Sequence, residues 1–140
     1  MPRLNTAIYF ACLVTTWFIG SDCVAKDPLG ATAKPLKVFV LAGQSNMQGH
    51  AHIRTIDAMR LNENAAPLLE VMRNPDGSDR VCDRVWISSI GSGDKEQTGK
   101  LTVGYGANAK GPKIGPEYTF GLTIEKMIDG PILVIKTAWG

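Results

Sequence analysis

Histidine and cysteine are scarce in this sequence of 140 residues, with two histidines and three cysteines. Cys12 and Cys23 lie near the start, so Cys82 is the only cysteine after residue 25 and no disulfide can form within that part of the chain. No group of His, Cys or carboxylate residues has the spacing of a metal site. The sequence therefore predicts no metal and no other cofactor, and Cys82 is expected to be a small residue of the core.

Long runs of one charge are also absent. The 15 basic and 13 acidic residues are scattered along the chain and give a formal net charge of +2. Without a basic run that could follow a phosphate backbone, nucleic acid is not an expected partner. Apolar residues make up 44% and charged residues 20%, which is typical of globular proteins and excludes collagen, wholesale disorder and coiled coils. The length suits one domain, near the lower limit for an α/β sandwich.

The apolar run near the N-terminus is too short to cross a bilayer comfortably. It covers residues 6–20, follows Arg3 and precedes Cys23-Val24-Ala25, which is the layout of a cleaved secretory signal. We predict a signal peptide over residues 1–25, a polar connector over residues 26–35, and a secreted or periplasmic protein with no membrane contact after cleavage. An uncleaved N-terminal anchor is the alternative, and a lipid anchor at Cys23 is disfavoured by the preceding Asp22.

Apolar, β-branched runs separated by a helical pattern predict an α/β domain over residues 36–140. Two runs are typical of strands buried on both faces of a parallel sheet, and shorter patterns predict another strand, two helices, a turn and a long loop. The strands are expected at residues 36–42, 85–90 and 131–138, the helices at 68–73 and 116–128, the turn at 74–77 and the loop at 91–113. The sequence ends directly after a strand, so we expect the domain to be incomplete at its C-terminus.

The most informative segment, Gly43-Gln44-Ser45-Asn46, lies where the first predicted strand ends. Ligands of open α/β sheets bind beyond the carboxyl ends of the strands, and a serine on a sharp turn there exposes its hydroxyl. The pattern alone equally fits a tight turn with a polar cap. It is not the Gly-x-Ser-x-Gly elbow, because Met47 occupies the place of the second glycine, and no Gly-Lys-Ser/Thr of a Walker loop follows.

Three segments together resemble the sialate O-acetylesterase and acetylxylan esterase family of carbohydrate esterases, within the SGNH hydrolase superfamily. They are Val-Leu-Ala-Gly-Gln-Ser-Asn-Met-x-Gly at residues 40–49, Gly-Pro-Glu at 115–117 and Ile-Lys-Thr-Ala-Trp-Gly at 135–140. The resemblance implies a three-layer α/β/α sandwich with a parallel sheet. It also implies hydrolysis of acetyl esters on a sugar or polysaccharide through a serine nucleophile, without a cofactor.

The same resemblance assigns roles to individual residues. Ser45 would be the nucleophile, and its backbone N–H would stabilise the oxyanion together with Gly140. Gln44 and Asn46 would shape the turn or contact the substrate. Glu117 would line the site, although an acid in the first turn of a helix is also favoured by the helix dipole.

A serine nucleophile needs a base, which this family supplies from a motif near the C-terminus that is not among these residues. His50 and His52 follow Ser45 too closely to match that base, so they are expected to be solvated loop residues, with a substrate contact as the alternative. We therefore predict the N-terminal part of an esterase, inactive alone. A non-catalytic carbohydrate-binding protein on the same fold is the second hypothesis, and a phosphate-binding loop protein is the third.

Overall fold

The computed structural model describes residues 34–91, 95–107 and 110–140, all within one unit of the chain, residues 32–140. The predicted signal peptide and most of the predicted connector lie outside the described residues. Among the described residues, no helix has the length and apolar character needed to cross a membrane.

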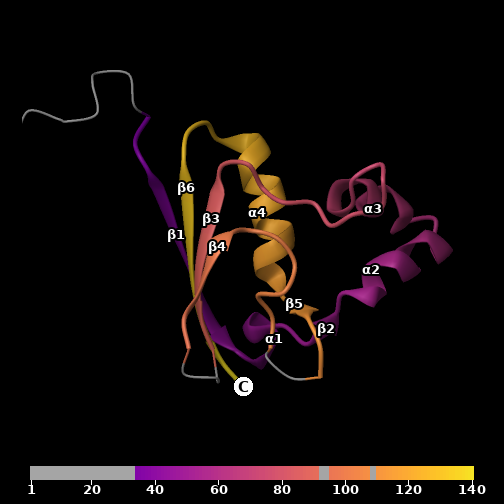
Figure 1. Ribbon diagram of the computed structural model, residues 1–140, viewed down its shortest axis with the longest axis horizontal. Helices are drawn as coiled ribbons and strands as arrows, with labels where there is room; N and C mark the ends of the chain where they lie inside the picture. Colours follow the sequence, from indigo (N-terminus) through magenta and orange to yellow (C-terminus); the bar gives the residue numbers. More distant parts are fainter. Residues whose placement is uncertain (1–33, 92–94, 108–109) are drawn as a thin grey trace, which may run out of the picture. The chain divides into compact units, whose positions relative to one another are not determined.

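The described chain contains both strands and helices (Figure 1). In order, the elements are β1 (Lys37–Gln44), α1 (Ser45–Gln48), β2 (Ala51–His52), α2 (Arg54–Ala58), the 3₁₀ helix η1 (Met59–Leu61), α3 (Ala66–Met72), β3 (Val85–Ile90), β4 (Gln97–Lys100), β5 (Lys113–Ile114), α4 (Pro116–Met127) and β6 (Ile132–Trp139). The predicted strands at residues 36–42, 85–90 and 131–138 correspond to β1, β3 and β6, and the predicted helices correspond to α3 and α4. The turn at 74–77 is confirmed by a bond from Gly77 N–H to the Asn74 carbonyl.

Four of the strands form one mixed sheet in the order β1-β6-β3-β4. β6 lies between β1 and β3 and pairs with both in parallel, whereas β4 pairs with β3 in antiparallel fashion. The fold is therefore α/β, but the expectation of a purely parallel sheet is wrong. The expected loop at 91–113 is wrong in part, because it contains β4 and β5. β4 consists of Gln-Thr-Gly-Lys, which has little apolar pattern, and its place in the sheet comes from its tertiary pairing with β3.

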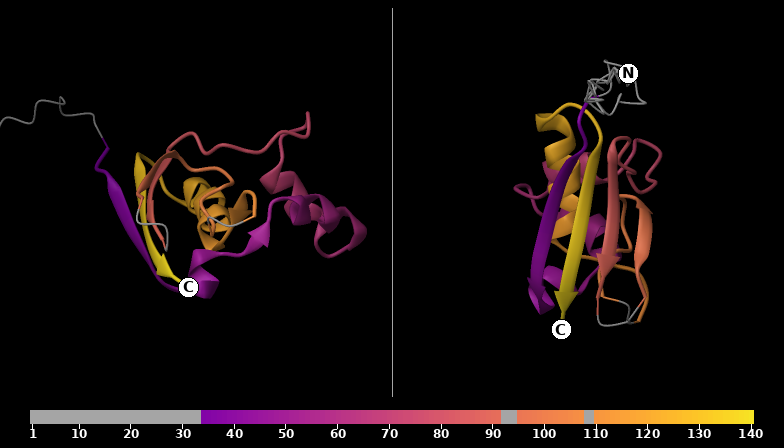
Figure 2. Two further views of the ribbon diagram at one scale, coloured as in Figure 1. Left: turned by 60° about the horizontal axis from the view of Figure 1, so that its bottom comes forward. Right: turned by 90° about the vertical axis from the view of Figure 1, so that its left-hand side faces the viewer.

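The described helices all lie on one side of the four-stranded sheet (Figure 2). The side chains of β3 and β6 that face this side are buried, among them Val85, Ile87, Ile132 and Val134. They pack with Tyr118 and Leu122 of α4 in the main core. Phe39 of β1 joins this layer through an edge-to-face contact with Phe120, with ring centroids 5.3 Å apart.

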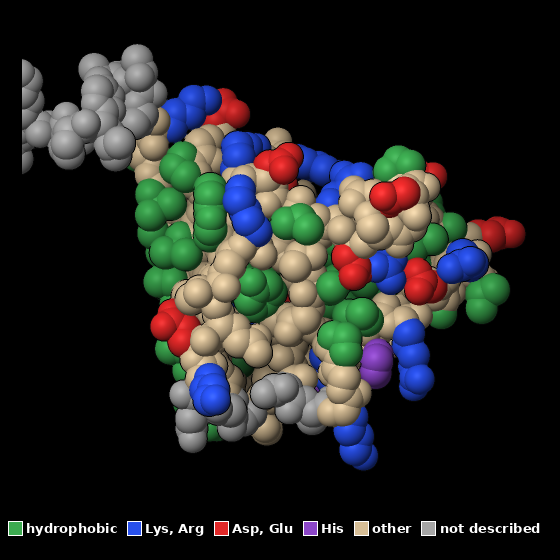
Figure 3. All heavy atoms as spheres, in the orientation of Figure 1, with side chains coloured by type: hydrophobic (Ala, Val, Ile, Leu, Met, Phe, Trp, Pro, Cys, Tyr) green, Lys and Arg blue, Asp and Glu red, His purple; other side chains and the backbone are tan. Residues whose placement is uncertain are grey.

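The other face of the sheet is apolar and exposed. Val38, Val40, Trp86, Ile90 and Trp139 lie on it, with Val40 63% and Trp139 53% exposed. Hydrophobic side chains gather along the edge of the molecule where β1 and β6 run (Figure 3). The prediction that β1 and β6 are buried on both faces is thus wrong for the described residues. The sequence pattern correctly predicts that both faces of these strands are apolar, but the described residues cover only one face of the sheet.

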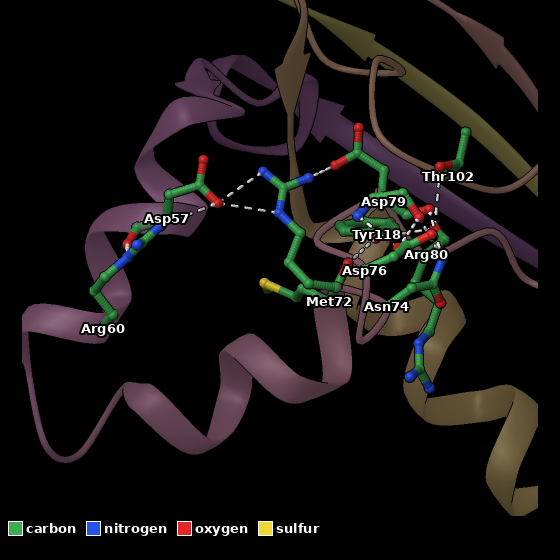
Figure 4. Close-up of polar contacts among 11 residues, drawn as sticks. Asp57, Arg60, Met72, Asn74, Asp76, Asp79, Arg80, Thr102 and Tyr118 are labelled. Carbon is green, nitrogen blue, oxygen red and sulfur yellow. Dashed lines mark hydrogen bonds and ion pairs between the residues drawn. The ribbon is translucent and has the colours of Figure 1, made fainter.

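Arg73 connects the helical region after α1 to the turn that precedes β3; its two partners, Asp57 and Asp79, are labelled in Figure 4. Its side chain forms ion pairs with Asp57 of α2 and with Asp79. The Tyr118 hydroxyl of α4 donates to the carbonyls of Met72, at 2.8 Å, and Arg80, at 3.0 Å. These contacts attach α2, α3 and the turn to the helix that covers the sheet.

Candidate active site

Ser45 lies on a sharp strand-to-helix turn at the carboxyl end of β1. β1 ends at Gln44, and Ser45 is the first residue of the single helical turn α1, which the Gly49 N–H closes by donating to the Ser45 carbonyl at 3.1 Å. A Cβ at Gly43 would lie 2.6 Å from the Met47 Cβ, so the turn requires glycine there. The side chains of Gln44, Ser45 and Asn46 are exposed, as the sequence predicts for a serine presented to a ligand.

Gly140 packs directly on Ser45. Because β1 and β6 are paired in register up to Gln44 and Trp139, the residues that follow each strand meet. A Cβ at Gly140 would lie 2.6 Å from the Ser45 Cα and 2.7 Å from its Cβ. Figures 1 and 2 both show the end of β6 beside α1. Two residues that are distant in sequence, and that the resemblance assigns to one oxyanion site, are therefore adjacent.

A shallow hollow of about 300 Å³ opens beside Ser45. It is lined by Ser45, Asn46, Gly49, His50, Ala51, Ile114, Gly115 and Pro116. This set brings together residues of the first two segments that carry the resemblance and adds His50. A larger hollow of about 560 Å³ around α3 and the following turn has no lining residue in common with it.

The wall of the Ser45 hollow depends on a close approach between Gly49 and Gly115. Gly49 has a φ of +82°, and a Cβ there would lie 2.1 Å from the Gly115 Cα. The carbonyl of Gly49 also accepts a hydrogen bond from Ala107 N–H at 2.8 Å. Backbone of the turn that carries Ser45 therefore packs against backbone at the start of α4, which only glycine permits.

A buried ion pair lies beneath the turn. The Lys136 ammonium, 2% exposed, donates to Glu117 Oε2 at 2.7 Å, and Glu117 is 0% exposed. Lys136 also donates to the carbonyls of Gln48 and Tyr105, each at 2.8 Å. Glu117 Oε1 accepts the Gly115 N–H at 2.9 Å. Both ions thus have hydrogen-bonded partners, as burial of charge requires.

The structure places most of the residues that the sequence singles out at or beside the hollow, and it buries Glu117. Ser45 and Asn46 line the hollow, and Gly140 packs on Ser45. Gln44 is the last residue of β1, directly before Ser45, and does not line the hollow. Glu117 is close, but its carboxylate is turned into the protein, which favours a positioning role over the predicted substrate contact.

The sequence analysis did not single out Lys136. The signal that could have found it is its position two residues from Val134 and from Ala138, which places all three on the same buried face of an apolar strand. The sequence analysis also did not place His50 at the hollow. That placement accords with the alternative of a substrate contact for His50.

The chemistry available here is that of an exposed serine hydroxyl. Among the described residues, no side chain forms a hydrogen bond with the Ser45 hydroxyl, and no three His, Cys, Asp or Glu side chains gather in a manner that could hold a metal ion. Tyr105 lines a separate hollow of about 230 Å³ that Gln48 and Lys136 also line, and burial raises the pKa of its hydroxyl.

Comparisons of this chain with protein-family models, with curated proteins and with solved structures found no match.

Proposed function

We propose that this chain carries the nucleophile of a serine-dependent carbohydrate O-acetylesterase, and that Ser45 attacks the acetyl carbonyl. The observation that carries the proposal is Gly140 packed on Ser45 at the edge of an open hollow, at the carboxyl ends of two parallel strands. In acyl transfer the nucleophile must lie close to the reacting carbon, and the oxyanion donors must lie within about 3 Å of the oxygen bound to that carbon. Ser45 and Gly140 are close enough to meet that condition.

The proposed reaction has two steps. Ser45 Oγ forms an ester bond with the acetyl carbon, and the sugar hydroxyl leaves with a proton; water then hydrolyses the acyl-enzyme and releases acetate. The base that takes the Ser45 proton is proposed to be a histidine outside these 140 residues, as the resemblance implies. The shallow, open hollow would admit an acetyl group on a polysaccharide surface.

The finer fold belongs to the same proposal. Val38, Val40 and Trp139 leave one face of the sheet apolar and exposed, which supports the three-layer sandwich of SGNH hydrolases. A second layer of helices on that face would bury them.

The test measures hydrolysis of p-nitrophenyl acetate and of acetylated xylan by the full-length gene product. Ser45→Ala is compared with Ser78→Ala, an exposed serine of the turn before β3 that does not line the hollow. We expect Ser45→Ala to lose at least 10³-fold in kcat, as nucleophile removal does in serine hydrolases, and Ser78→Ala to keep wild-type activity.

Two other results would change the assignment. Activity retained in Ser45→Ala would show that Ser45 is not the nucleophile. A folded wild-type protein without activity that still binds the acetylated polysaccharide would favour the non-catalytic binding protein. A His50→Ala variant measured beside them separates a base from a substrate contact: a base lowers kcat, whereas a contact raises KM.

A further inference from the structure

Lys136 is a buried cation attached to the turn that carries Ser45. It lies on the inner face of β6 between Val134 and Ala138, both buried. Its three ammonium protons match three acceptors: the carbonyl of Gln48, the carbonyl of Tyr105 and the carboxylate of Glu117. Gln48 is the last residue of α1. One end of this single helical turn is therefore fixed to β6 by Lys136, and the other end begins with Ser45.

Glu117 extends the same connection to the opposite wall of the hollow. One carboxylate oxygen accepts from Lys136, and the other accepts from the backbone N–H of Gly115, which lines the Ser45 hollow. The ion pair thus joins α1, β6 and the start of α4. A shift of any one of these elements would break a charge-assisted hydrogen bond inside the protein.

Stability alone does not explain a buried ion pair. The cost of removing two charges from water cancels most of their attraction, and apolar residues of the same volume often stabilise a fold as well or better. An apolar side chain, however, cannot hold a particular carbonyl oxygen in place. What the pair adds is therefore a defined position for the Gln48 carbonyl, and through it for α1.

We infer that Lys136, held by Glu117, is a positioning residue that sets the place of Ser45 relative to Gly140. This inference rests on the proposed function, in which the distance between these two residues determines the rate. Displacing a reacting group by about 1 Å lowers a rate by up to roughly 100-fold. Lys136 does not touch the reacting atoms, so its effect passes through the Gln48 carbonyl.

The test uses the double variant Glu117→Gln/Lys136→Met in the full-length gene product. It removes both charges together, so neither ion is left unpaired, and the glutamine oxygen can still accept from Gly115. What it removes is the connection to Gln48 and Tyr105. The matched control is Val134→Ala, which leaves a cavity on the same face of the same strand without touching α1.

Three quantities are measured for each folded variant: kcat and KM for p-nitrophenyl acetate, and the exchange rate of the Gly49 amide, which closes α1. We expect the double variant to lose about 10- to 100-fold in kcat with an unchanged KM, and its Gly49 amide to exchange at least tenfold faster. Val134→Ala should keep wild-type kcat per folded molecule. The ratio of its Gly49 amide exchange rate to the rate of the amides that exchange only by global unfolding should also stay at the wild-type value.

A double variant with wild-type kcat and wild-type Gly49 exchange would overturn the inference. If that variant does not fold, Lys136→Arg decides, because it keeps the charge opposite Glu117 but its planar fork cannot reproduce three converging bonds; unchanged Gly49 exchange in Lys136→Arg would also overturn it. The exchange measurement does not depend on hydrolysis. Failure of the esterase proposal, shown by an active Ser45→Ala, is thereby distinguished from failure of the positioning role.

Discussion

Substituting Gly49 by alanine should damage the fold far more than the same substitution at Gly77, although both glycines have a positive φ. Their φ angles are +82° and +84°. A Cβ at Gly77 would meet nothing within 4 Å, whereas one at Gly49 would lie 2.1 Å from the Gly115 Cα and 2.6 Å from the Ile114 carbonyl oxygen. The two glycines therefore share a positive φ, and Gly49 adds a close contact with backbone atoms.

The magnitudes follow from these two terms. Gly77→Ala bears only the strain of a left-handed residue with a side chain, about 1 kcal/mol of unfolding free energy. Gly49→Ala bears at least that strain, because its ψ of 112° lies outside the left-handed helical region, and it adds overpacking, which typically costs about 1–3 kcal/mol. Because the atoms that the new methyl group would meet belong to the backbone, no side-chain rotation can relieve the overlap. We expect a total loss of about 3 kcal/mol or more.

Urea unfolding followed by circular dichroism measures both values, with the m-value as a check that the unfolded states are alike. Equal losses of stability in the two variants would refute the reasoning, since they would show that the backbone of Gly49 and Gly115 is not in contact in solution. A loss well above about 1 kcal/mol in Gly77→Ala would refute the cost assigned to a side chain at positive φ.

Two further predictions concern Cys82 and Gly140. Burial and the neighbouring Glu125 raise the pKa of Cys82 from 9.0 to about 12. Because the thiol of the unfolded chain loses its proton first, the free energy of unfolding should fall by up to about 1.4 kcal/mol per pH unit above pH 9. Urea unfolding at pH 8 to 11 should show a steeper fall of that free energy in the wild type than in Cys82→Ala. Gly140→Ala should lower kcat of the full-length product about tenfold or more, because the added methyl group would displace Ser45. Gly91→Ala, whose methyl group would meet atoms only at 3.5 Å, should keep wild-type kcat, and equal effects of the two substitutions would contradict the contact.

The strands and helices that bury apolar side chains were predictable from the sequence. β3, β6 and α4 each bury one face, and β1 half-buries Phe39 and Leu41; the apolar patterning in the sequence reflects that burial. β4 buries little and is held by pairing with β3, including Lys100 placed over the Trp86 ring at 4.0 Å. Such a strand leaves no periodic signal, so the sequence predicts a loop there.

Strand order was beyond the reach of the pattern for a different reason. β6 is the last strand of the sequence, yet it lies between β1 and β3. Nothing in the composition of an apolar strand says which neighbour it pairs with. That position brings the residue after β6 onto Ser45 and directs Lys136 toward α1, so both contacts follow from topology that the pattern could not give.

The geometry around Ser45 supports the proposed nucleophile over the other two hypotheses for this turn. A simple capped turn would need glycine at Gly43 and nothing more, yet Gly49 and Gly140 are also required by close contacts, with Gly115 and with Ser45 respectively. A phosphate-binding loop would need a cation directed at the ligand. The nearby buried cation is Lys136, whose protons are engaged by three protein acceptors at the far end of α1 from Ser45. A turn fixed from three distant segments, with its serine exposed and its nearby lysine engaged below it, fits the presentation of a nucleophile better than either alternative.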